Sequence, residues 1–183
     1  MHIALFGIAG SGKSTLTRKL VSANVQYIGL SASTLLKQKG RPVEISEIRN
    51  DALSINQKHL IAAYESLKSS NENTIVEFHA VIETNNTEFW VPIEILKRLQ
   101  PDLIFFINAN PSDIFCRRTQ DKSKFRRIIS KAEISKLQSN ALLHVFEAYG
   151  KDKVVIAGNF DAFRVINEAI NKAGHAKCTS CST

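Results

Sequence analysis

The sequence predicts a three-layer α/β fold in which helices cover both faces of a five-stranded parallel sheet. Short apolar runs, each of the length of a buried strand, recur at residues 2–6, 25–28, 74–78, 103–107 and 154–157. A segment whose apolar residues have helical spacing separates each run from the next. Strands that alternate with helices are joined by right-handed crossovers, and these connections place the strands parallel to one another.

The helical segments have recognisable beginnings and ends. Apolar residues keep near-helical spacing over residues 46–67, with Ser46 as the expected N-cap. A second helix begins at Asn110-Pro111, because proline is favoured at the first helical position, and a third covers residues 134–148 and ends at Gly150. The last helix is predicted over residues 161–173.

The chain is expected to form one domain over residues 1–173, followed by a disordered tail at residues 174–183 that has little to bury. Within this tail, His175, Cys178 and Cys181 have a spacing compatible with zinc. They are nevertheless one ligand short of a structural zinc site, so no zinc is predicted.

The composition is that of a globular protein with an uneven distribution of charge. The 183 residues include 24 Lys plus Arg and 17 Asp plus Glu, which gives a net charge of +7. Eight basic and two acidic residues lie between residues 117 and 136. Such a density of positive charge favours binding of nucleotide phosphates or nucleic acid. The alternative is a basic helix face that is exposed to solvent.

No run reaches the roughly 20 apolar residues of a membrane span, and the three cysteines are too few for a disulfide framework. We therefore expect a cytoplasmic protein without membrane partners.

The segment directly after the first apolar run, residues 7–14, matches the phosphate-binding pattern G-x-x-x-x-G-K-[ST]. Glycines allow successive backbone N–H groups to face a phosphate, and the helix that follows adds its positive end. Lys13 can reach the β- and γ-phosphates, and the Ser14 hydroxyl can bind Mg²⁺. The pattern thus predicts a P-loop NTPase fold with MgATP or MgGTP. The predicted ATP-binding residues are Gly7, Ala9, Gly10, Ser11, Gly12, Lys13, Ser14 and Thr15.

Several segments, taken in order over about residues 1–172, resemble the nucleoside monophosphate kinases, in particular the archaeal-type adenylate kinases and their adenylate kinase/ATPase relatives. Besides the phosphate-binding loop, the resemblance rests on Ser31-Ala-Ser-Thr-Leu-Leu, Ile48-Arg49-Asn50, Glu77-Phe78-His79, Leu96-Lys-Arg-Leu-Gln-Pro-Asp-Leu after Pro92, and Arg117-Arg-Thr-Gln-Asp. It implies transfer of the γ-phosphoryl group of MgATP to AMP or a similar monophosphate. It also implies a helical monophosphate-binding insertion at about residues 30–72 and a short lid at about residues 117–131.

The same resemblance assigns roles to individual residues. Arg117 or Arg118, together with Arg126, would join Lys13 as catalytic cations that clamp the transferred group. Arg49 would hold the acceptor phosphate, with Ser31 and Ser33 lining that pocket. At the end of the third strand, His79 either touches the acceptor or is a hydrogen-bonded structural histidine.

Three features depart from the family pattern, one of which is that the helix after the lid lacks the usual Arg and has only Lys136 as a nearby cation. Glu77 stands where the archaeal-type enzymes usually carry Asp, and its longer side chain can still hold a Mg²⁺-bound water. The lid sequence Lys124-Phe125-Arg126-Arg127 lacks the usual closing Asp. These departures leave three alternatives open: a kinase of another small acceptor, an ATPase on the same fold, and an ATP-regulated factor that binds RNA through its basic segment.

Overall fold

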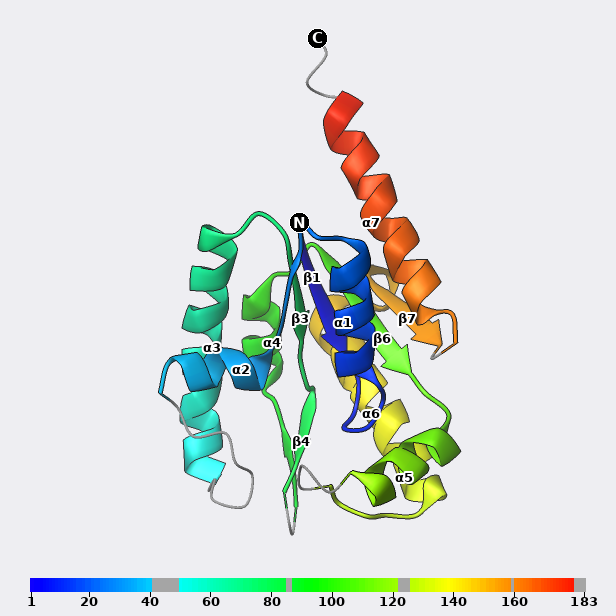
Figure 1. Ribbon diagram of the computed structural model, residues 1–183. Helices are drawn as coiled ribbons and strands as arrows, with labels where there is room; N and C mark the ends of the chain where they lie inside the picture. Colours follow the sequence, from blue (N-terminus) through cyan, green and yellow to red (C-terminus); the bar gives the residue numbers. More distant parts are fainter. Residues whose placement is uncertain (41–49, 85–86, 122–125, 159, 180–183) are drawn as a thin grey trace.

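The computed structural model describes residues 1–40, 50–84, 87–121, 126–158 and 160–179, and its centre is a five-stranded parallel sheet (Figure 1). The strands lie in the order β2-β3-β1-β6-β7, and all four neighbouring pairs are parallel. Their bounds are β1 His2–Phe6, β2 Ile28–Ser31, β3 Thr74–Glu77, β6 Leu103–Asn108 and β7 Val154–Gly158. The predicted α/β class and the parallel five-stranded sheet are confirmed.

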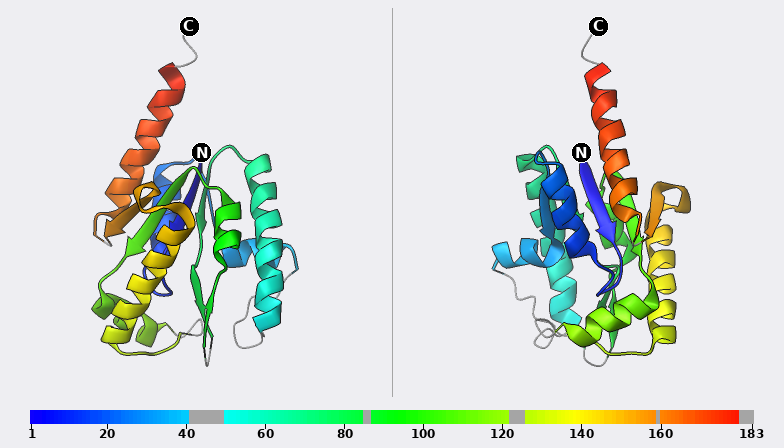
Figure 2. Two further views of the ribbon diagram at one scale, coloured as in Figure 1. Left: turned by 180° about the vertical axis from the view of Figure 1, so that it is seen from behind. Right: turned by 45° about the vertical axis from the view of Figure 1, so that its right-hand side comes forward.

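Helices cover both faces of the sheet, as the two views in Figure 2 show. One face carries α1 Lys13–Ala23 and α7 Ala162–Thr179. The other face carries α3 Asn50–Ser70, α4 Ile93–Leu99 and α6 Lys131–Tyr149. The remaining helices are α2 Ala32–Gln38, α5 Pro111–Gln120 and the 3₁₀ turn η1 Lys151–Lys153. The fold therefore has three layers.

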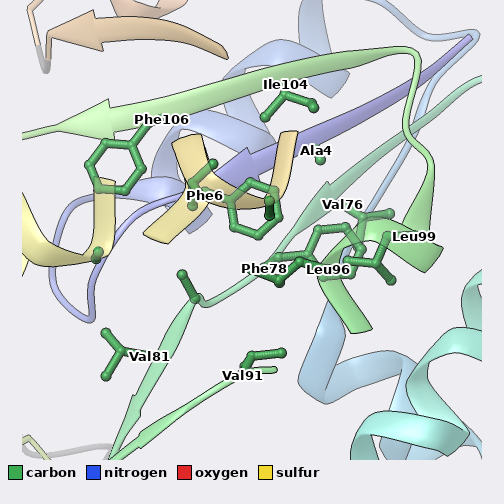
Figure 3. Close-up of a cluster of buried hydrophobic side chains, with 14 of the residues drawn as sticks. Ala4, Phe6, Val76, Phe78, Val81, Val91, Leu96, Leu99, Ile104 and Phe106 are labelled. Atoms are coloured by element: carbon green, nitrogen blue, oxygen red, sulfur yellow. The ribbon is translucent and has the colours of Figure 1, made fainter. Parts of the chain in front are cut away.

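Side chains of the central strand β1 alternate between two hydrophobic clusters, one on each face of the sheet. Ile3 and Leu5 pack towards α1 and α7, while Ala4 and Phe6 belong to the larger cluster on the opposite face. In that larger cluster, drawn in Figure 3, the ring of Phe6 stacks on that of Phe78 with centroids 5.6 Å apart. All four of these β1 side chains are fully buried, because helices cover both faces of a parallel sheet.

Two sequence predictions on this fold were wrong in position. The second strand begins at Ile28 rather than Val25, because residues 24–27 form a turn in which Tyr27 N–H donates to Asn24 O. Val25 is consequently 89% exposed. The last helix continues past residue 173 to Thr179, so residues 174–179, predicted to be disordered, are helical. In Figure 1 this helix projects beyond the sheet at the end opposite the phosphate-binding loop.

The sequence analysis also missed an antiparallel hairpin formed by β4 Val81–Glu83 and β5 Glu88–Trp90. This hairpin leaves the carboxyl end of β3 and lies on the same side of the molecule as the phosphate-binding loop and α5 (Figure 1). Among the residues that the structure describes, none forms a helix long and apolar enough to cross a membrane.

Candidate functional site

The phosphate-binding loop connects β1 to α1 at the carboxyl edge of the sheet. Gly10 and Gly12 have φ angles of +85° and +98°, in the left-handed region that favours glycine. A Cβ on Gly10 would lie 3.3 Å from both the Arg118 Cγ and the Ile114 Cγ2 atoms, so α5 packs directly against the loop. Inside the loop, the fully buried Ser11 Oγ has no hydrogen-bond partner among the described residues. The glycine cradle predicted from the motif is thus formed.

Lys13 is buried at the start of α1 and its ammonium group lies on the loop itself. Its Nζ donates to the Gly7 carbonyl at 2.6 Å and to the Ile8 carbonyl at 3.1 Å. Burial lowers the pKa of Lys13 to about 7; the nearby Glu77 carboxylate opposes this shift and Arg126 adds to it. An anionic ligand in the loop would supply the negative charge that favours the protonated lysine.

Ser14 and Glu77 form a pair of oxygen ligands beside the loop. The Ser14 hydroxyl donates to the Glu77 Oε2 atom at 2.7 Å, which joins the first turn of α1 to the end of β3. A hydroxyl and a carboxylate are the hard oxygen donors that Mg²⁺ prefers. These two residues therefore fit Mg²⁺, which Ser14 would hold together with Glu77, directly or through water.

The predicted acceptor residues fall into two groups in the structure. Ser31 lies beside Glu77 in the β2–β3 register, but its Oγ accepts from Thr34 N–H as the N-cap of α2 and bonds to the exposed Ser33 hydroxyl at 2.8 Å. His79 is partly buried and lines a cavity next to the phosphate-binding loop. Arg49 lies outside the described residues.

The four described arginines of the predicted lid are all engaged close to the site. Arg117 Nη1 donates to the Gly10 carbonyl at 3.1 Å, and Arg126 pairs with Asp121 at 3.0 Å. Arg127 pairs with Glu88 of the hairpin at 3.4 Å. Arg118 is 2% exposed and forms a bidentate salt bridge to Glu83. The structure therefore separates the two candidate clamps Arg117 and Arg118, because Arg118 is held in a buried ion pair.

A cavity of about 60 Å³ lies between the phosphate-binding loop, the hairpin and the lid arginines. It is lined by Ala9, His79, Val81, Ile82, Glu83, Arg126 and Arg127. Residues from three separate segments thus line one space at the carboxyl edge, where parallel α/β sheets bind ligands.

Glu83 is a site residue that the sequence analysis missed. It belongs to no motif, and its importance follows from the hairpin that places it against Arg118. A signal was present, since two short runs rich in apolar and aromatic residues flank Asn85-Asn86 in the sequence, a pattern typical of hairpins. The tail residues His175, Cys178 and Cys181 have side chains outside the described part of the chain.

Comparison with known proteins gives a consistent picture. The chain is 27% identical to an adenylate kinase of Pyrococcus furiosus over 191 residues, covering 93% of this chain and 97% of that protein. It is 29% identical to an adenylate kinase of Methanothermobacter thermautotrophicus over 139 residues, covering 72% and 75% of the two chains. The resemblance to archaeal adenylate kinases predicted from the sequence is confirmed.

Solved structures share the fold at lower identity. A shikimate kinase from Acinetobacter baumannii in complex with shikimate has a TM-score of 0.62 and 16% identity, covering 96% of this chain and 93% of that one. A deoxyadenosine kinase from M. mycoides with bound dATP has a TM-score of 0.55 and 17% identity, covering 93% and 100%. A family profile described as an AAA domain matches residues 6–135, well over half of the chain. By this match, the protein belongs to the AAA domain family.

Proposed function

We propose that this protein is an ATP-dependent phosphotransferase, a nucleoside monophosphate kinase of the adenylate kinase type. The observation that carries the proposal is the convergence of three groups at one edge of the sheet. These are the phosphate-binding loop with the buried Lys13, the Ser14–Glu77 pair, and the cavity lined by His79 and Arg126. The archaeal relatives named adenylate kinases support the same activity.

The proposed reaction transfers the γ-phosphoryl group of ATP to a phosphate oxygen of the monophosphate. A P–O bond to the acceptor forms while the bond between the γ-phosphorus and the β–γ bridging oxygen breaks, which yields two diphosphates. The transition state carries its charge on phosphoryl oxygens, so catalysis requires positioned cations. Lys13 and the loop N–H groups would bind the β- and γ-phosphates, and Arg126 faces the space where the transferred group would lie. Mg²⁺, held by Ser14 and Glu77, would neutralise phosphate charge when bound.

AMP is the acceptor we propose, on the strength of the relatives' names. His79 would contact this acceptor from the cavity wall, and Ser31 and Ser33 would line the pocket beyond β2. A cytoplasmic location belongs to the same proposal. RNA binding through the lid is less favoured, because Arg118 and Arg127 are already paired with carboxylates of the hairpin.

Activity assays with defined acceptors test the proposal. Purified protein is incubated with MgATP alone and with AMP, CMP, UMP or GMP, and nucleotides are separated by chromatography. We expect ADP to form only when a monophosphate is present, with AMP giving the highest kcat/KM. Phosphate release that needs no acceptor would identify an ATPase instead. Absence of both reactions, combined with salt-dependent binding of RNA, would favour the RNA-binding alternative.

Arg49 provides a separate test of the acceptor site. We expect Arg49→Ala to raise the KM for the monophosphate about tenfold or more, because a charge-assisted contact to phosphate is lost, and to leave ATP affinity unchanged. Lys58→Ala, which removes an exposed cation from α3, is the control. An unchanged acceptor KM would show that Arg49 does not bind the acceptor.

A further inference from the structure

The side chain of Arg118 uses all five of its N–H groups. Nε and Nη2 donate to the Ala9 carbonyl at 3.0 and 2.9 Å. Nη2 and Nη1 donate to the two carboxylate oxygens of Glu83, each at 2.7 Å, and Nη1 also donates to the Arg127 carbonyl at 3.1 Å. A guanidinium has five N–H donors in a fixed planar arrangement, so this group has no donor left for a phosphate.

These bonds join three segments that are far apart in the sequence. Ala9 belongs to the phosphate-binding loop, Glu83 to β4 of the hairpin, and Arg127 to the later part of the predicted lid. All three acceptors also line the cavity described above. Because Glu83 and Arg118 are 6% and 2% exposed, solvent does not weaken this pair as it weakens a surface ion pair.

The contact with Ala9 has a direct consequence for the loop. A trans peptide is planar, so its C=O and N–H groups point in opposite directions. When Arg118 holds the Ala9 carbonyl, it also fixes the direction of the Gly10 N–H, which belongs to the same peptide. Arg117 fixes the next carbonyl, that of Gly10, in a similar way. The two consecutive arginines of α5 thus determine how this part of the loop is oriented.

We propose that Arg118, held in place by Glu83, is a positioning residue that fixes the phosphate-binding loop against the β4–β5 hairpin and thereby shapes the transfer cavity. Arg118 touches neither nucleotide nor acceptor in this assignment, and Arg126 and Arg127 remain as cations that line the cavity. The expected effect of Arg118 on turnover rests on the proposed function. The expected effect on ATP binding depends only on the orientation of the phosphate-binding loop.

Variants of the pair test the assignment against two simpler explanations. Glu83→Leu combined with Arg118→Met replaces a buried ion pair by apolar side chains of similar size, a change that is often neutral for stability. Glu83→Gln keeps the shape of the side chain and removes its charge. As a control, Arg164→Met with Glu168→Leu removes an exposed ion pair of α7 that lies 3.1 Å apart. ATP affinity is measured by calorimetry without acceptor, followed by kcat, KM and thermal unfolding.

We expect the double variant to unfold within a few degrees of the parent protein. Its ATP affinity and kcat/KM should fall about 10- to 100-fold, because Arg118 no longer holds the loop against the hairpin. Glu83→Gln should lose affinity in the same direction, and the control should lose none. A folded double variant with full affinity and turnover would overturn the proposal. Faster turnover in Glu83→Gln would also overturn it, since Arg118 would then be a phosphate clamp that Glu83 restrains.

Two further outcomes also decide between the proposals. If the double variant does not fold, Glu83→Gln decides alone, with unchanged ATP affinity counting against the proposal. If the parent protein binds MgATP but phosphorylates no monophosphate, the proposed function fails. The positioning role is then still supported or refuted by the calorimetric affinities of the variants.

Discussion

Individual residues at the site are held in states that favour an anionic ligand. Lys13 is buried against two backbone carbonyls, and Ser11 Oγ is buried without a partner among the described residues. Both arrangements are unfavourable in the free protein, because a buried charge and an unsatisfied hydroxyl raise its free energy. Triphosphate oxygens would pair with both the ammonium group and the hydroxyl. The free protein is therefore less stable at this edge than it would be with apolar side chains, and ligand binding would recover that free energy.

Replacement of Lys13 tests this exchange. We expect Lys13→Met to lower kcat by about 10²–10³-fold or more, since a cation on the transferred phosphates is lost. The same variant should unfold at an equal or higher temperature than the parent protein, because a buried ammonium is replaced by an apolar side chain. Turnover assays and thermal unfolding check the two results, with Lys19→Met on the exposed side of α1 as the control. Full activity in Lys13→Met would remove the phosphate-binding assignment.

The lowered pKa of Lys13 also predicts a dependence on pH. Its pKa of about 7 in the folded protein lies below the ordinary value of 10.5, so the folded state binds fewer protons than the unfolded state between these limits. The destabilisation is fully present below pH 7 and disappears as the pH rises towards 10.5. Phosphate oxygens raise this pKa again, so MgATP binding above pH 7 should take up a proton and weaken as the pH increases.

Calorimetry in buffers of different ionisation enthalpy measures this uptake. At pH 8.5 the apparent binding enthalpy should depend on the buffer for the parent protein and should be nearly independent of it for Lys13→Met. Equal buffer dependence in both proteins would assign the proton to another group.

At the scale of elements, local sequence signals determine where several helices begin and end. Asn110 caps α5 through a bond from Ser112 N–H, with Pro111 at the first helical position, as predicted. Helix α6 begins with a capping box in which Ser130 Oγ accepts from Glu133 N–H and the Glu133 carboxylate accepts from Ser130 N–H. This helix carries core residues that cover one face of the sheet. It begins where the predicted lid ends.

The capping box of α6 gives a prediction for stability. Ser130→Ala should lower the free energy of unfolding by about 1 kcal/mol, because the cap of an N-terminal turn is lost. Ser135→Ala, an exposed position on the same helix, should have little effect. Hydrogen bonds from Ser130 lower the pKa of Glu133, so the capped protein should lose this advantage as the pH falls through that lowered pKa. Urea unfolding at pH 7 and at acidic pH checks both expectations, and identical values for the two variants would contradict them.

At the scale of the whole molecule, the strands of the sheet run from the hydrophobic core to the candidate site at their carboxyl edge. Phe6 belongs to the larger cluster (Figure 3), and it is the last residue of β1 before the phosphate-binding loop. The centroid of its ring lies 5.6 Å from that of Phe78 and 5.8 Å from that of Tyr149. The loop therefore begins directly after one of the largest fully buried side chains among the described residues. Packing of this kind resists displacement, because protein interiors have the density of organic crystals.

Removal of the Phe6 ring tests this role of the core. Phe6→Ala should lower the free energy of unfolding by about 3–5 kcal/mol, from lost burial and from the cavity that remains. Phe160→Ala removes a ring that is 95% exposed and should have little effect. Denaturant unfolding of the two variants provides the comparison. A small effect of Phe6→Ala would mean that the larger cluster repacks to fill the space left by the ring.

Structural features that depend on residues close together in the sequence were predicted well, and contacts between distant segments were not. The motif at residues 7–14 predicted the loop, and apolar runs and helix caps predicted the fold class and the starts of α1, α5 and α7. These features depend on backbone geometry and periodicity within a few residues. The assignment of β2 missed by three residues, since an apolar run alone does not reveal the turn that places Val25 in solvent.

Only the tertiary structure showed that Arg118 is held in a buried ion pair and that its partner Glu83 lines the cavity. In the sequence, Arg117 and Arg118 are equivalent neighbours, and Glu83 lies 35 positions from its partner. One arginine reaches the loop from a partly exposed position while the next is buried in an ion pair, because successive residues of a helix point in different directions. The sequence by itself thus predicted a phosphate-binding loop here, and the packing of α5 against the loop and the hairpin decided that Arg118 is held in an ion pair.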